Sequence, residues 1–179
     1  MNPLKDNEDV ACFAVTKHSW KGKYKRIFSV GTMGISTYNP GKIEVTNQWF
    51  YSDFINITPT GKGQTGDEFI INMKKGRKIE SMKFSSEHRA EILTEALRFR
   101  SKFADSTYSS PRYSALKLHW SDSTLPVTLE LSPASIQQKD VTSGSTIASY
   151  DYKDIQQFVL VSDREGGFVV VCSEFGRQV

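Results

Sequence analysis

The period of the apolar residues changes once in this chain, at Ser86, and this change limits the possible folds most strongly. Before it, short runs of β-branched and aromatic residues alternate with turn residues, which predicts about seven strands. After it, Ile92, Ala96 and Phe99 recur at spacings of four and three, with Ser85 or Ser86 as the N-cap of a predicted helix over 86–103. Strands followed by one amphipathic helix predict a mainly β fold, a half-open barrel or sandwich closed by its last helix.

The strand pattern then restarts as a second, weaker copy at an offset near 100 residues. The segment 51–55 is echoed at 152–155, and the segment 17–20 is echoed at 117–120. We therefore expect one domain over residues 8–105 and a second, incomplete domain over residues 111–179. The second copy lacks a counterpart of the helix, so its sheet should expose an apolar face. Further polypeptide of a longer protein, another chain or the linker could cover that face.

The segment 17–30 combines positive charge with aromatic rings and contains no acidic residue. Indeed, no acidic residue lies between Asp9 and Glu44. We interpret this segment as a basic loop between two strands, over 10–16 and 27–30, that binds an anionic partner. A phosphorylated lipid headgroup is the favoured ligand, because basic and amphipathic aromatic side chains suit a membrane surface. The residues of this predicted site are Lys17, Trp20, Lys21, Lys23, Tyr24, Lys25 and Arg26.

Several other classes of protein do not suit the sequence. No apolar stretch reaches the length of a membrane span, and the N-terminus does not resemble a signal peptide, so any membrane contact is expected to be peripheral. Cys12 and Cys172 lack metal-ligand spacing, which predicts a reduced, cytosolic protein with Cys12 buried. No catalytic, cofactor or metal motif is present, so neither an enzyme nor a cofactor is expected. A pI near 8.8 and an acidic second half argue against nucleic-acid binding.

Two levels of resemblance sharpen these expectations. A barrel with a C-terminal helix and a Lys-loop-aromatic-Lys-Arg-x-Phe entry to its second strand resembles the pleckstrin-homology fold. More specifically, the chain resembles the N-terminus of the endosomal J-domain co-chaperone family called receptor-mediated endocytosis protein eight. The segments that carry this second resemblance are 16–32, 37–40, 44–49, 87–89, 93–100 and 119–123.

The family resemblance implies a non-catalytic module that binds phosphatidylinositol 3-phosphate on the cytosolic face of early endosomes, in a protein of retrograde sorting and clathrin-coat turnover. It implies lipid contacts at Lys17, Trp20 and Tyr24, supported by the basic patch of Lys21, Lys23, Lys25 and Arg26. It also implies a J domain that recruits an Hsp70-type chaperone, although no His-Pro-Asp motif occurs in these residues. Tyr24 replaces the basic residue that usually stands two positions before the arginine, which favours a singly phosphorylated headgroup.

A second hypothesis is a protein-interaction module of pleckstrin or phosphotyrosine-binding type, with only general electrostatic attraction to membranes. In that case the second copy could hold a partner peptide by strand addition. Ser121 to Pro126 replaces the basic segment there, so we expect the second copy to act as a brace or a protein contact. The sequence leaves the oligomeric state, the endosomal partners and the choice among monophosphoinositides open.

Overall fold

A computed structural model describes residues 6–60, 66–103, 109–119 and 121–173. The chain divides into two compact units, Met1–Ser106 and Thr107–Val179, which are described separately below. The segment 104–111, which we expect to be a linker between the two domains, lies mostly outside the described residues. The described part contains no helix that is long and apolar enough to cross a membrane.

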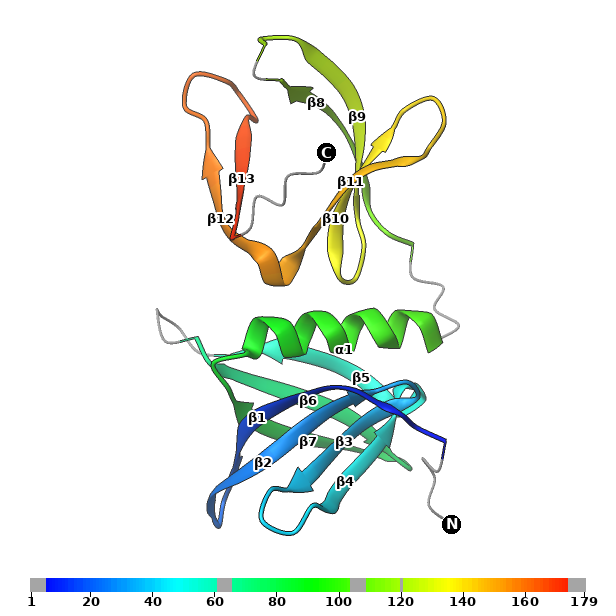
Figure 1. Cartoon of the computed structure of the whole chain (residues 1–179), viewed down its shortest axis with the longest axis vertical. Helices are drawn as coiled ribbons and strands as arrows, with labels where there is room; N and C mark the ends of the chain where they lie inside the picture. The colour runs from blue at the N-terminus through cyan, green and yellow to red at the C-terminus, as the bar shows by residue number, and fades with distance from the viewer. Residues whose placement is uncertain (1–5, 61–65, 104–108, 120, 174–179) are drawn as a thin grey trace. The chain divides into compact units, whose positions relative to one another are not determined.

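The first unit is a seven-stranded antiparallel sheet followed by one helix (Figure 1). The strand order is β4-β3-β2-β1-β7-β6-β5, so the last strand of this unit, β7, lies beside its first strand, β1. This confirms the predicted mainly β, pleckstrin-homology-like fold. The elements are β1 (Asp9–Ser19), β2 (Gly22–Gly31), β3 (Gly34–Asn39), β4 (Glu44–Phe50), η1 (Tyr51–Asp53), β5 (Phe54–Pro59), β6 (Glu68–Lys75), β7 (Lys78–Ser85) and α1 (Arg89–Phe103).

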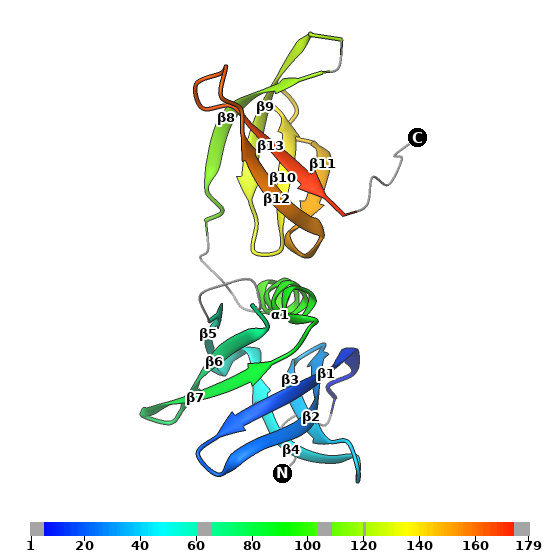
Figure 2. The same ribbon diagram turned by 90° about the vertical axis from the view of Figure 1, so that its left-hand side faces the viewer.

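Three aromatic rings from three strands form the centre of this unit. Phe28, Phe69 and Phe84 are each fully buried, with ring centroids 5.6–5.8 Å apart. The helix α1 adds Ile92 and Ala96, which are also fully buried, so the predicted apolar face of the helix faces the core. This packing closes one end of the curved sheet (Figures 1 and 2).

The helix begins later than its sequence pattern suggests. Residues 87–88 form a turn, and α1 starts at Arg89. Ser86 nevertheless caps this turn, because its hydroxyl accepts the His88 N–H at 3.2 Å and donates to the Ala14 carbonyl at 2.7 Å. The cap therefore also fastens the start of the helix to β1.

The expectation that Cys12 is buried is wrong. Its side chain is exposed on β1, because the alternation that directs Phe13 and Val15 to the core directs Cys12 outward. An apolar run in the sequence therefore did not mean burial on both faces of this strand.

The second unit repeats the order of the first as far as the sixth strand. Its elements are β8 (Arg112–Leu118), β9 (Thr124–Leu131), β10 (Ser135–Asp140), β11 (Thr146–Asp151), η2 (Tyr152–Asp154), β12 (Ile155–Leu160) and β13 (Phe168–Cys172). The strands form a four-stranded sheet, β11-β10-β9-β8, and a separate β12-β13 hairpin. Figures 1 and 2 show the hairpin facing the four-stranded sheet.

A shared tyrosine contact confirms that the second unit is a copy of the first. In the first unit, the Tyr51 hydroxyl donates to the Gly31 carbonyl at 2.7 Å; in the second, the Tyr152 hydroxyl donates to the Ser132 carbonyl at 2.8 Å. Both tyrosines begin a three-residue 3-10 helix with the same cap geometry. This shared contact gives an offset of 101 residues in this region, and the strand registers align the other elements of the two units at offsets of 99 to 101.

One ionic cluster is specific to the second unit. Glu130 is buried on β9 and accepts hydrogen bonds from Arg112 Nε at 2.7 Å and from Lys139 Nζ at 2.8 Å. The Lys139 ammonium lowers the pKa of Glu130 most, burial opposes this effect, and Arg112 lowers the pKa further. Glu130 thus connects three neighbouring strands through side chains.

We expect Glu130→Gln to destabilise the second unit by about 1–3 kcal/mol at neutral pH, because it leaves two cations without their carboxylate. The folded-state pKa of Glu130 is depressed, so this contribution is present above its unfolded-state pKa and is lost as the pH falls through its folded-state pKa. Hydrogen exchange in β9 and β10 at pH 7 and in acid measures the difference. Glu165→Gln, at an exposed position, is the control; equal exchange in the two variants at pH 7 would contradict the expectation.

Candidate functional site

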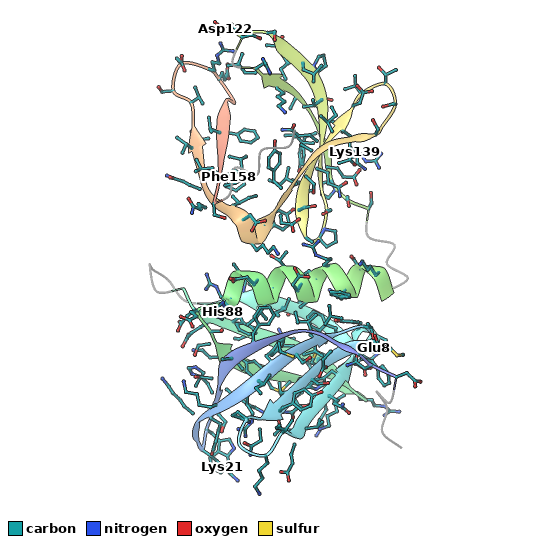
Figure 3. All side chains as sticks on the ribbon, in the orientation of Figure 1. Glu8, Lys21, His88, Asp122, Lys139 and Phe158 are labelled. Atoms are coloured by element: carbon teal, nitrogen blue, oxygen red, sulfur yellow. The ribbon has the colours of Figure 1, made fainter. Side chains whose placement is uncertain are left out.

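The basic segment is a tight β-hairpin, which corrects the prediction of a long loop. Strand β1 continues to Ser19 and β2 begins at Gly22, so only Trp20 and Lys21 form the turn. Gly22 has a φ of +132°, a conformation that glycine adopts without strain. Most of the predicted site residues are therefore held in strand geometry, and the turn lies at the end of the barrel away from α1 (Figures 1 and 3).

The register of this hairpin sorts the predicted residues onto two faces. Lys17 lies opposite Tyr24, and Val15 lies opposite Arg26. Val15 is buried in the core, so Lys17, Tyr24 and Arg26 lie on the inner face, next to the open end of the barrel. We call these three residues the inner cluster.

The remaining lysines of the strands lie on the outer face. Lys23 pairs with His18 and Lys25 pairs with Thr16, as strand alternation predicts. His18 also pairs with Lys83 on β7, and its Nε2 lies 2.9 Å from the Ser85 hydroxyl. One headgroup therefore cannot contact all the predicted basic residues, because they point to opposite sides of the sheet.

Lys17, in the inner cluster, has a shifted pKa. Burial lowers the pKa of its ammonium below the ordinary value, the negative charge of Glu80 partly opposes this shift, and Arg26 adds to it. Glu80 lies on β7, four residues before the Phe84 that pairs with Lys17. The negative charge of an anion close to Lys17 would stabilise the charged ammonium and so compensate for the hydration that burial removes.

Arg26 and Tyr24 lie against each other on β2. The guanidinium carbon of Arg26 lies 5.4 Å from the centroid of the Tyr24 ring, and its Nη1 donates to the Lys25 carbonyl at 2.7 Å. Its Nε is buried and has no hydrogen-bond partner among the described residues. The inner cluster therefore offers two cations and one hydroxyl with donor capacity to spare.

The turn presents an aromatic side chain to solvent. Trp20 is 92% exposed, and the Lys21 ammonium lies 4.9 Å from its ring centroid. Lys21 marks this tip in Figure 3. The indole at the tip of this hairpin is therefore accessible to a partner.

The second unit keeps one residue of this cluster and replaces the others. Lys117 occupies the place of Lys17, and its cross-strand partner is Leu125 instead of tyrosine. The counterpart of Arg26 is Val127, which is buried with 1% of its surface exposed. Trp120, which echoes Trp20 in the sequence, lies outside the described residues. The second unit therefore keeps one cation at this end, while the counterparts of Tyr24 and Arg26 are apolar.

An acidic residue of the site, Glu80, was absent from the sequence-based prediction. It lines a shallow hollow of about 410 Å³ next to Lys74 and Lys75, and its carboxylate lies 3.6 Å from the Lys75 ammonium. Only the pairing of β1 with β7 brings Glu80 near Lys17, since the two residues are far apart in the sequence. Alternation within β7, which places Glu80 on the same face as Phe84, was the available signal.

Comparison with known proteins assigns the family. The family model for the N-terminal domain of the DNAJ protein RME-8 matches residues 12–103, about half of the chain. This chain belongs to the RME-8 family. The model for the second domain of RME-8 matches residues 113–178, so the family models cover both units.

A curated relative and two solved structures are similar to this RME-8 family chain. The DnaJ homolog subfamily C GRV2 of Arabidopsis thaliana is 31% identical over 98% of the chain, which spans only 7% of the length of that relative. The C-terminal domain of an unknown protein from Leishmania infantum has a TM-score of 0.47 at 5% identity over 55% of this chain and 88% of its own. The Slm1-PH domain in complex with inositol-4-phosphate has a TM-score of 0.43 at 9% identity. This match covers 54% of the present chain and 98% of the Slm1-PH chain.

Proposed function

We propose that the first unit binds a singly phosphorylated phosphoinositide, phosphatidylinositol 3-phosphate, and thereby targets a longer J-domain protein to early endosomes. Lys17, Tyr24 and Arg26 contact the headgroup, while Trp20 enters the membrane interface. The module itself is non-catalytic. Its connection to an Hsp70-type chaperone and to retrograde sorting runs through parts of the protein outside this chain.

The single observation that carries this proposal is the placement of Lys17 opposite Tyr24, on the inner face and directly below the exposed Trp20 turn. A headgroup held by the inner cluster would keep its lipid chains near the indole, because both lie at the same end of the hairpin. Lys21 at the tip and Lys23 and Lys25 on the outer face then add general attraction to anionic lipid.

The magnitudes indicate weak, reversible binding by a single copy. Each basic side chain near an anionic surface contributes about 1 kcal/mol, and salt reduces this value. With one inserted ring, the total corresponds to a Kd of roughly micromolar. Stable residence on a membrane would therefore depend on additional contacts elsewhere in the longer protein or on several copies acting together.

Vesicle flotation at physiological salt tests the proposed function. The 179-residue chain is mixed with neutral vesicles, or with vesicles of matched total charge that contain phosphatidylinositol 3-phosphate, phosphatidylinositol 4-phosphate or phosphatidylserine. The proposal expects the strongest flotation with the 3-phosphate lipid. Equal flotation with all three anionic lipids would indicate a general electrostatic surface, and no flotation would favour the protein-interaction hypothesis.

We expect Glu80→Gln to strengthen binding to phosphoinositide vesicles by about two- to fivefold, because it removes one negative charge that interacts with Lys17. Co-sedimentation against lipid concentration measures the change. Glu87→Gln removes the same charge beside α1, at the other end of the barrel, and should leave the affinity nearly unchanged. An equal gain in both variants would mean that only net charge matters.

A further inference from the structure

The two units bury the same interior positions to very different degrees. In β6, Phe69 and Ile71 are fully buried and pair with residues of β7 and β5. The β12-β13 hairpin has the same pairing pattern as β5-β6, including a shift after its first pair. Through this register Phe168 corresponds to Phe69, and it is 45% exposed. An interior position of the fold is therefore open in the second unit.

The neighbouring strand β12 also exposes an apolar side chain at an interior position. Phe158 on β12 corresponds to Ile57 and is 54% exposed, whereas Ile57 is 6% exposed. Leu160, which is 83% exposed, corresponds to Pro59, a position that is exposed in the first unit as well, so Leu160 lies at the edge of the opening. Phe158 also lies 6.3 Å, between ring centroids, from Phe168. Figure 3 shows Phe158 on the side of the hairpin that faces the four-stranded sheet. Together these side chains form an apolar surface, the open face, defined by Phe158, Leu160 and Phe168.

The first unit shows what normally covers this face. Strand β7 lies between β1 and β6, and its Phe84 packs on Phe69 with ring centroids 5.7 Å apart. In the second unit the counterparts of β1 and β6 are β8 and β13, and among the described residues each pairs with only one neighbour. The missing components are thus one antiparallel strand between β8 and β13 and a helix in the place of α1.

The sequence indicates where these components come from. The turn between β6 and β7 contains Gly76, at a φ of +60°, followed by Arg77. The same pair recurs as Gly176-Arg177, at an offset of 100, which is one residue more than the offset between Phe69 and Phe168; these two residues lie outside the described part. In the first unit, strand β7 starts directly after this pair. The sequence repeat therefore extends to the point where a counterpart of β7 would start.

We propose that the polypeptide beyond residue 179 in the longer protein completes the second unit. It adds a strand between β13 and β8, with a large apolar residue against Phe168, and then an amphipathic helix over the open face. A curated relative of far greater length than this chain is consistent with such a continuation. The open face is thus an intramolecular docking surface for the next strand and helix.

Hydrogen exchange on two lengths of chain tests this proposal. The 179-residue chain is compared with one extended by native sequence to residue ~205, which corresponds to the end of α1. In the extended chain we expect protection of the amides of β8 and β13 to rise by roughly 100-fold or more, and 1-anilinonaphthalene-8-sulfonate fluorescence to fall several-fold. The exchange of the first unit serves as an internal reference in both chains.

Two neighbouring residues on opposite faces of β13 provide a matched pair of variants. Phe168 and Val169 are 45% and 50% exposed, so glutamine at either position should destabilise the 179-residue chain only slightly. In the extended chain, only Phe168→Gln should reduce the gained protection. Unchanged exchange of β13 on extension would overturn the proposal. Protection of β13 in the shorter chain together with a concentration-dependent dimer would overturn it in favour of a second copy as the occupant.

Discussion

Lys17→Gln is expected to weaken binding to vesicles containing phosphatidylinositol 3-phosphate by more than about tenfold, whereas Lys25→Gln should cost about fivefold or less. The two variants remove the same charge from the same hairpin. Lys17 belongs to the inner cluster and is half-buried, while Lys25 is exposed on the outer face. Co-sedimentation against lipid concentration measures both affinities.

The difference follows from how each ammonium would act. A charge-assisted hydrogen bond in a partly desolvated site contributes about 1.5–3 kcal/mol, whereas a solvated lysine near a membrane contributes about 1 kcal/mol. Raising the salt concentration should therefore reduce the effect of Lys25→Gln more than that of Lys17→Gln. Equal losses in both variants, with equal salt dependence, would show that the hairpin acts only as a charged surface.

Phe69→Ala is expected to destabilise the first unit by about 3–5 kcal/mol, whereas Phe168→Ala should cost the second unit about 1 kcal/mol in the 179-residue chain. The two residues occupy the same position of the repeated fold. Phe69 is fully buried between Phe28 and Phe84, so truncation leaves a cavity among three rings. Phe168 is nearly half exposed, so its truncation removes less buried surface.

Hydrogen exchange of strands β6 and β13 separates these two effects, because each unit reports its own stability in the whole chain. The matched control is Val169→Ala, on the outer face of β13, which should change the exchange of β13 very little. Similar destabilisation by Phe69→Ala and Phe168→Ala would contradict the assignment of an open interior to the second unit.

The order of elements was predictable from the sequence because most strands carry a clear apolar period. The change of apolar period at Ser86 predicted the strands and the helix, and the repeat of Tyr51 at Tyr152 predicted the second copy. The structure confirms these elements. The exact ends of the strands and the helix were harder to predict from the sequence. Strand β1 continues to Ser19 through four consecutive polar residues, 16–19, and a run of polar residues after an apolar pattern is typical of a loop.

The candidate site was predictable only in part, for a physical reason. Alternation within β2 separates Tyr24 and Arg26 from Lys23 and Lys25 on the basis of the sequence alone. The pairing of β1 with β7 is a long-range contact, however, and local pattern does not specify its register. For that reason the influence of Glu80 on Lys17 emerged only from the folded structure.

The most direct test of the proposed site is an NMR titration of the 179-residue chain with a soluble, short-chain phosphatidylinositol 3-phosphate. The account predicts saturable shifts at Lys17, Tyr24 and Arg26, with much smaller shifts at Lys25 and at Lys117, the counterpart of Lys17 in the second unit. The same titration with short-chain phosphatidylinositol 4-phosphate should give weaker shifts. Shifts confined to the outer face or to the second unit, or none at all, would contradict headgroup binding by the inner cluster.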